Sequence, residues 1–290
     1  MHPAPSVILF TVLSGLGFGV LAVLGLGALP LAGWAAAFAW GLGYALAVGG
    51  LGASTFHLGN PQRAWRAFSQ WRTSWLSREA WASVAALLVL APTAMSDVFG
   101  WGLPRILGGL GAALAALAVL CTGMIYAQLR TVPRWNHWIT PALFLAFAAL
   151  GGAIVTVRLP WALGLCAILA GLLVAAFQRG DGAFAARGAT LGSATGLDRL
   201  GAPAVFELPH SGPNYLTREM IFVVGRRHAA KLRVLAVVLA CLLPAAILAA
   251  LPAPVAAVLA TAVHLAGAFA ARWLFFAEAE HVVGLYYGRR

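Results

Sequence analysis

Long apolar runs alternate with shorter polar links along the whole chain. Eight runs approach the roughly 20 residues that a helix needs to cross a bilayer core. They cover residues 5–29, 32–56, 79–99, 104–127, 139–157, 160–178, 234–252 and 254–278. A run such as ILGGLGAALAALAVLCTGMI lacks the alternation of apolar and polar residues that is typical of membrane barrels. The pattern predicts an all-α integral membrane protein, a bundle of eight transmembrane helices in a single domain over residues 1–290.

The longest polar link covers residues 179–233, between the sixth and seventh runs. Its first half is rich in Gly and Ala and predicts an irregular surface loop. Its second half, PNYLTREMIFVVGRRHAAKLR, mixes apolar and charged residues at helical spacing, which predicts a helix lying on the membrane surface. A link of this length favours docking of a partner protein, with an unpartnered cytoplasmic insert as the alternative.

Small residues crowd several of the apolar runs. The stretch GLGFG places Gly15 and Gly19 at GxxxG spacing, which allows helix backbones to approach closely. This pattern indicates a compact bundle and does not indicate a function.

The composition agrees with a membrane protein. Hydrophobic residues make up 62% of the 290 residues and charged residues 9%, and the mean hydropathy is +0.88. This balance excludes a soluble globular domain. No apolar run has an acidic residue near its middle, which argues against a proton pump or an ion channel.

The basic residues gather on one side of the predicted bundle. Sixteen of the 19 Lys and Arg residues lie in the links around 57–78, 128–138 and 179–233 and in the C-terminal tail. Short basic loops stay in the cytoplasm, so we expect both termini and these links on the cytoplasmic side of the bacterial inner membrane. Most of these residues are explained as topology signals that also attract anionic lipid headgroups. We expect no nucleic-acid site.

Cysteine and histidine patterns argue against metal centres in this chain. Cys121, Cys166 and Cys241 each lie in a different apolar run, too scattered for a metal site or an iron–sulfur cluster. His264 is the only histidine well inside a run, whereas haem b needs two axial ligands from facing helices. Glu278 and Glu280 end the last run, where an ion pair with Arg272 is the simplest role.

The stretch STFHLGNPQRAWRAFSQWRTSWLSREAW, residues 54–81, holds the main candidate site. His57 ends the second run and Glu79 begins the third, so both belong to the cytoplasmic edge if the two helices are neighbours. A histidine titrates near neutrality, and together with a carboxyl group it can pass protons to a buried acceptor. Guanidinium groups alternating with aromatic rings between them can stack on a planar ligand. In the alternative interpretation, Ser77 and Glu79 merely cap and charge the start of a helix.

Two further candidates come from position alone. Tyr126 ends the fourth run, and Arg130 follows one turn later in the next basic link. Both are expected at the same cytoplasmic edge.

Three motifs occur in an order that resembles a known family. FHLGNPQRAW and SWLSREAW, followed by TVPRWNHWITP, resemble the membrane-anchor (C) subunit of the dimethyl sulfoxide reductase family, the DmsC type. The loop PHSGPNYLTREMIFVVGRRHAAKLR resembles the anchor of the cytoplasmic sulfite dehydrogenase branch.

The resemblance implies one part of a three-subunit oxidoreductase complex. A partner subunit with a molybdenum pterin would carry out the substrate chemistry, and a four-cluster iron–sulfur subunit on the cytoplasmic face would carry electrons. The anchor would exchange them with ubiquinone or menaquinone and hold no haem. The quinone-linked histidine and glutamate of the family match His57 and Glu79 here, and its loop arginine matches Arg63. Ser77 also matches the motif, whereas Arg78 occupies a variable position of it. We expect Arg63, Ser77 and Arg78 beside His57 and Glu79 at the quinone, with Tyr126 and Arg130 as the candidates from position. The expected activity is quinone reduction during cytoplasmic sulfite oxidation.

Three alternatives stay open on the sequence. The chain could fill the same anchor role in a quinol-oxidising complex of the dimethyl sulfoxide reductase type. It could be a secondary anion transporter, which would take up solute in vesicles without partner subunits. It could also be a purely structural anchor, on which a quinone-site inhibitor leaves no signal.

Overall fold

The computed structural model describes residues 1–207, 210, 212, 214–221 and 228–288, and the side chain of His57 lies outside the described part. All regular elements of these residues are helical, which confirms the predicted all-α class. The α-helices are α1 Pro5–Gly25, α2 Gly33–Ala53, α3 Trp75–Phe99, α4 Ile106–Ala127, α5 Ile139–Val155, α6 Leu159–Ala186, α7 Leu191–Thr195, α8 Ala229–Val237, α9 Leu243–Ala250 and α10 Ala253–Ala277. Short 3₁₀ and π segments are η1 Ser54–His57, η2 Pro61–Phe68, η3 Leu216–Met220, η5 Val238–Leu242 and η6 Val282–Tyr287.

Seven helical segments of the described residues are long and apolar enough to cross a membrane. Helices α8 and α9 join through η5 into one of them, Ala229–Ala250. The remaining predicted span is α5, an apolar helix of 17 residues. At about 1.5 Å per residue it is about 26 Å long, shorter than a typical hydrocarbon core.

The long link between the sixth and seventh runs is shorter than predicted. Helix α6 continues to Ala186, beyond the predicted end at residue 178, and α8 begins at Ala229. The extension is polar and carries Asp181, which forms ion pairs with two arginines. The hydropathy pattern therefore showed where α6 becomes polar, at residue 178, and not where the helix ends. Of the predicted surface helix over 213–233, only η3 and the start of α8 are seen as helix, and residues 222–227 lie outside the described residues.

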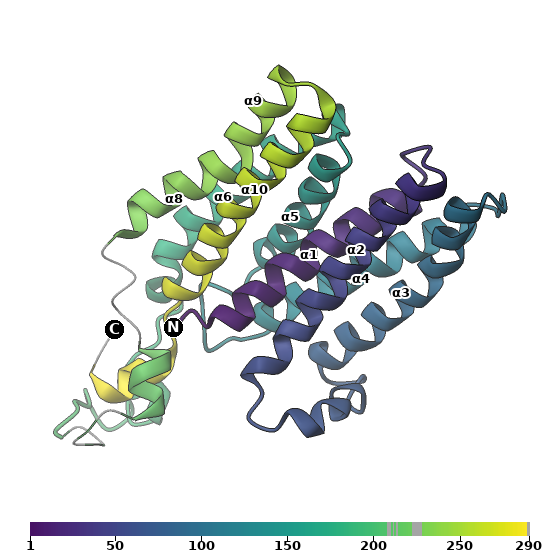
Figure 1. The fold of residues 1–290 in the computed structure, drawn as a ribbon. Coiled ribbons are helices and arrows are strands. Elements are labelled where there is room, and N and C mark those ends of the chain that lie inside the picture. The colour runs from purple at the N-terminus through teal and green to yellow at the C-terminus, as the bar shows by residue number, and fades with distance from the viewer. Residues whose placement is uncertain (208–209, 211, 213, 222–227, 289–290) are drawn as a thin grey trace.

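Helix α1 lies at the centre of the bundle and packs against α2, α4 and α5 (Figure 1). Glycines make these contacts close. A Cβ atom on Gly17 would collide with the backbone of Ala47 in α2, and one on Gly19 with the carbonyl group of Ala148 in α5. The small residues of the runs are thus used for backbone contact between helices, as their number indicated.

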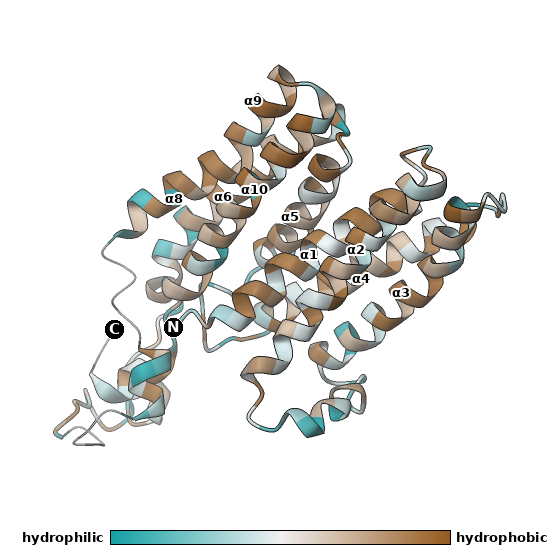
Figure 2. Cartoon of the chain, in the orientation of Figure 1, coloured by the Kyte–Doolittle hydropathy of each residue, from teal (hydrophilic) through white to brown (hydrophobic). Residues whose placement is uncertain are grey.

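One end of the bundle collects the N-terminus, η1 and η2, the link between α4 and α5, the segment after α6, and η6 (Figure 1). Hydrogen bonds join these parts: the N-terminal amine donates to Ala279 O at 2.7 Å, and Val282 N donates to Thr131 O at 3.0 Å. Figure 2 shows hydrophilic residues at this end, along η2 and the segment after α6. The structure confirms that the basic links share one end, which we call the basic end.

Candidate functional site

The carboxyl group of Glu79 is buried at the basic end of the bundle. Glu79 lies one turn into α3 and is only 4% exposed. Its Oε1 lies 2.5 Å from Thr122 Oγ1 of α4. Thr122 Oγ1 also lies 3.0 Å from Ala118 O, one turn earlier in its own helix.

A single hydroxyl group cannot donate to both neighbours at once, because it carries one proton. When Thr122 donates to Glu79, the carboxyl group is the acceptor and can be ionised. When Thr122 donates to Ala118 O, it can accept from a protonated Glu79. Rotation of the Thr122 hydroxyl group therefore allows the pair to hold Glu79 either with or without a proton.

Ser77 does not cap the helix, as the alternative interpretation of this stretch required. Helix α3 begins at Trp75 with Ser74 at the N-cap position, and no side chain caps it. Ser77 sits inside the first turn and is 1% exposed, and its Oγ has no partner among the described atoms. The hydroxyl group of Ser83 is in the same situation one turn beyond Glu79. A buried hydroxyl group without a partner is costly, so a bound molecule that accepts from it would be stabilised.

Arg78 fastens the preceding link to α3. Its Nε donates to Trp71 O at 3.0 Å and its Nη2 to Arg72 O at 2.7 Å, and its guanidinium lies 4.3 Å from the ring centroid of Trp75. Trp81 adds a bond from Nε1 to Phe68 O at 3.0 Å. These contacts hold η2 against the start of α3, and they give Arg78 a structural role.

His57 and Arg63 belong to the segment that leads to α3. His57 is the last residue of η1, and its side chain is not described. Arg63 is exposed in η2. The structure therefore brings the link of Arg63 next to the helix of Glu79, while the proximity of the His57 ring to Glu79 stays a prediction.

Tyr126 and Arg130 differ in burial. The ring of Tyr126 is buried in an aromatic cluster, with the rings of four residues at centroid distances of 5.3 to 5.6 Å: Trp135, Phe144, Phe275 and Phe276. Arg130 is exposed in the link after α4. The turn between them sends one side chain into the core and the other to the surface.

Arg272 does not form the predicted ion pair with the end of α10. It is 6% exposed, and its guanidinium lies 3.6 Å from the ring centroid of Phe144. Glu278 instead accepts from Arg233 Nε at 2.7 Å and Arg134 Nη1 at 3.2 Å. Residues 272 and 278 are six positions apart, about 240° around a helix, whereas only positions three or four apart share a face. The spacing in the sequence was therefore sufficient to argue against an ion pair between Arg272 and Glu278.

An ion-pair network at the basic end connects four segments that are distant in the sequence. Asp181 of α6 pairs with Arg134 at 2.8 Å, and its second oxygen accepts from Arg233 Nη1 of α8 at 2.7 Å. Glu278, which follows α10, completes the network. The sequence did not reveal it, because Asp181 was assigned to a loop.

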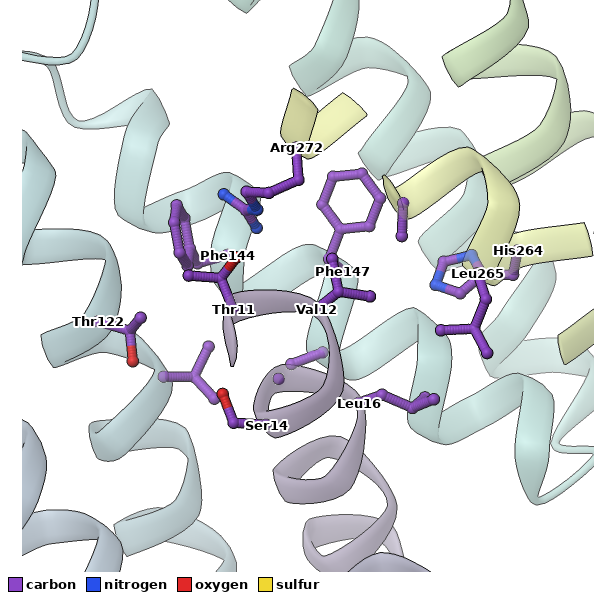
Figure 3. Close-up of a pocket in the computed structure, with 14 residues that line it drawn as sticks. Thr11, Val12, Ser14, Leu16, Thr122, Phe144, Phe147, His264, Leu265 and Arg272 are labelled. Carbon is purple, nitrogen blue, oxygen red and sulfur yellow. The ribbon is translucent and has the colours of Figure 1, made fainter. Parts of the chain in front are cut away.

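Two cavities share Arg272 and Phe147. The first, which we call the interior cavity, lies between α1, α4, α5 and α10 and has a volume of about 20 Å³; Figure 3 shows its lining. The outer cavity encloses about 50 Å³ between α5, α6 and α10. Its polar lining residues are Arg134, His137, Thr140, Arg179, Arg272 and Glu278. Burial, followed by the charge of Arg179, lowers the pKa of His137, so this ring stays neutral near pH 7.

Comparisons with known proteins agree on one family. The sequence matches the family described as DMSO reductase anchor subunit (DmsC) over residues 1–178. It is 31% identical to the sulfite dehydrogenase (C) subunit of Allochromatium vinosum, in an alignment that covers 99% of both chains. No solved structure matches the chain. Glu79, Thr122 and the link of His57 lie within the matched range, whereas Arg272 lies beyond it.

Proposed function

Because the chain belongs to the family of DMSO reductase anchor subunits (DmsC), we propose that it exchanges electrons between its partner subunits and membrane quinone. It is a multi-pass membrane anchor of an oxidoreductase complex of the sulfite dehydrogenase type. The name of the A. vinosum relative supports sulfite oxidation as the reaction of the complex, and membership of a quinone-interacting family supports quinone as the acceptor of its electrons. In this proposal the molybdenum pterin and the iron–sulfur clusters belong to the partner subunits.

The buried pair of Glu79 and Thr122 is the observation that carries the proposal. A quinone, when bound and reduced, takes up two electrons and two protons. It requires a nearby group that can hold and release a proton, and the rotating hydroxyl group of Thr122 lets Glu79 do so. His57 is proposed as the second proton-exchanging group, from the family resemblance.

Side chains near Glu79 are of the kinds that bind a ring with carbonyl groups. The unpartnered hydroxyl group of Ser77 can donate to a carbonyl oxygen. Trp65 and Trp71 on the adjacent link are exposed, and an arginine lies over each ring, at 5.6 Å for Arg66 and 5.5 Å for Arg72. Aromatic rings of this kind belong at the headgroup level of a bilayer. We propose that Arg63, on the same link, faces the headgroup of the ligand.

We place the basic end in the cytoplasm and count α5 as the eighth crossing. The basic links support this orientation. Most of the α5 side chains are buried by neighbouring helices, so α5 does not have to match the full thickness of the lipid. The partner subunit that carries electrons would dock on the basic end, which η2 and the segment after α6 cover (Figure 1).

The proposal predicts separate effects of site variants on two acceptors. In the purified complex, Glu79→Gln and His57→Ala should slow quinone-coupled turnover by at least about 10-fold, since removal of a proton-transfer group typically costs 10²–10⁴-fold. Turnover with a soluble electron acceptor should stay near that of the wild type. Steady-state assays with a short-chain quinone and with a soluble dye measure both.

Asp97, near the end of α3 that is distant from Glu79, provides a control carboxylate outside the proposed site and docking surface. Asp97→Asn removes the same charge there and should leave both activities unchanged. Equal losses with both acceptors in the Glu79 and His57 variants would show that these residues support assembly and would overturn the proposed role.

A further inference from the structure

The interior cavity connects the Glu79 pair with the centre of the bundle. Thr122, which contacts Glu79, also lines this cavity, and Arg272 lines its opposite side. Figure 3 shows both side chains at the cavity, together with Thr11 and Ser14 of α1. Glu79 itself is 4% exposed. The hydroxyl group of Thr122 connects its buried carboxyl group with the cavity.

Arg272 is the unusual member of the lining. It is buried, its Nε has no partner among the described atoms, and no described carboxylate is hydrogen-bonded to it. The ring of Phe144 compensates part of its charge through a cation–π contact. An N–H group buried without a partner is costly, so the cavity favours a molecule that accepts from it.

The size and polarity of the cavity fit one water molecule. Its volume of about 20 Å³ exceeds the roughly 10–15 Å³ that a buried water requires. The hydroxyl groups of Thr11 and Ser14 donate to Val7 O at 2.9 Å and to Phe10 O at 2.6 Å. Their oxygen atoms can therefore accept from a water that itself accepts from Arg272, and this gives the water the two to four partners it needs.

The outer cavity continues the polar route toward the basic end. It shares Arg272 and Phe147 with the interior cavity, so these two side chains form the partition between them. On its other side it is lined by Arg134, His137 and Glu278. A series of polar groups thus extends from the basic end to Glu79 through the inside of the bundle.

We propose that the interior cavity binds a water molecule between Arg272 and Thr122, and that this water lets Glu79 exchange protons with the basic end. The inference rests on the proposed function of Glu79. Thr122 Oγ1 receives a proton from the water as it passes its own proton to the Glu79 carboxylate. A hydronium ion of the solvent, which reaches the partition through the outer cavity, returns one proton to this water and leaves as water. Arg272 stays protonated and positions the water.

The test is hydrogen–deuterium exchange of the Glu79 carboxyl group, followed by infrared spectroscopy of the full chain in lipid nanodiscs. The C=O stretching band of protonated Glu79, assigned by its loss in Glu79→Gln, shifts on transfer into D₂O. Thr122→Val keeps the shape of the side chain and removes its hydroxyl group. We expect exchange at least about 10-fold slower than in the wild type, whereas Thr122→Ser should exchange at the wild-type rate.

Thr11→Val provides an independent variant that removes one acceptor of the water. Thr11 lines the cavity, and valine keeps the shape of the side chain without its hydroxyl group. This variant should retain its melting temperature and slow exchange as Thr122→Val does. Exchange at the wild-type rate in both variants would overturn the water route.

Quinone turnover of Glu79→Gln separates this inference from the proposed function. Wild-type quinone turnover in Glu79→Gln would overturn the proposed role of Glu79. The exchange rates of the Glu79 carboxyl group in the other variants would still show whether the water route exists. Slow turnover in Glu79→Gln together with unchanged exchange in Thr122→Val and Thr11→Val would overturn the water route alone.

Discussion

Glu79, His264 and Arg272 lie inside the bundle, and each of these side chains is accommodated differently. Glu79 bonds a hydroxyl group, His264 Nδ1–H donates to Ala240 O at 2.8 Å, and Arg272 lies over an aromatic ring. Ionisable groups in the interior of a membrane protein are costly and mark functional positions by default. Glu79 and Arg272 meet this expectation because both adjoin the same cavity, Glu79 through Thr122.

The sequence predicted Glu79 but not its partner. The position of Glu79 after a polar link, at the start of an apolar run, was visible as a pattern. Thr122 was not, since it is one small hydroxyl residue in a long apolar run. Only the packing of α4 on α3 shows which carboxyl group it meets. A local pattern records charge, whereas a hydrogen bond between helices depends on their register.

His281 should make the C-terminal segment sensitive to pH. Burial, followed by the positive charge of the N-terminus, lowers the pKa of His281, and its Nδ1 accepts from Val283 N at 3.0 Å. The neutral ring is thus favoured in the folded state. As the pH falls below about 6.5, the unfolded segment binds more protons and the folded one loses stability.

Amide exchange measured by mass spectrometry checks this effect. After correction for intrinsic exchange, η6 should exchange faster at pH 5.5 than at pH 7.5 in the wild type. His281→Gln, which keeps an acceptor but does not titrate, should show no such difference. A pH effect of the same size in His281→Gln would contradict the assignment.

At the scale of helices, the two glycines of the GxxxG pattern have different roles. Gly19 and Gly152 bring α1 and α5 into backbone contact, since a Cβ atom on either would collide with the other helix. Gly15 instead faces the interior cavity. The pattern predicted close packing correctly, but spacing alone could not show which glycine makes the contact.

Gly19→Ala should therefore destabilise the bundle. The added methyl group collides with backbone atoms of α5, which cannot move aside as a flexible side chain would. Overpacking of this kind costs about 1–3 kcal/mol. Gly41→Ala in α2 is the control, because a Cβ atom there meets no described atom within 4 Å and alanine favours a helix.

Thermal unfolding in detergent compares the two variants. Gly19→Ala should melt at a lower temperature than the wild type, and Gly41→Ala at the same or a higher temperature. Equal melting temperatures would mean that α1 and α5 can separate without cost.

For the whole molecule, the distribution of charge correctly predicted that the basic links lie at one end of the bundle. Hydropathy was less accurate in predicting where the helices end. The basic links share one end of the bundle, as their composition indicated (Figure 2). The ends of α6 and α8 were misplaced because both helices continue into polar sequence that Asp181 and Arg233 stabilise. The contacts that join residues far apart in the chain determine these boundaries, and a sequence window does not contain them.

Labelling of introduced cysteines tests the orientation. The native cysteines Cys121, Cys166 and Cys241 are buried, which keeps the background low. In intact cells, a membrane-impermeant maleimide should label Gly102→Cys at the end opposite the basic end. It should label Ser69→Cys only after the cells are opened. The reverse pattern would place the basic end outside the cytoplasm.

The network of Arg134, Asp181, Arg233 and Glu278 has a consequence for how the protein is made. The ribosome delivers its members in that order, and Glu278 emerges only after all the transmembrane helices have been synthesised. Until then, the two arginines share the single carboxylate of Asp181, and α10 is not joined to them. In a nascent chain halted before Glu278, the ion pairs of Arg134 and Arg233 with Glu278 are therefore absent. The network is complete only when synthesis has passed Glu278.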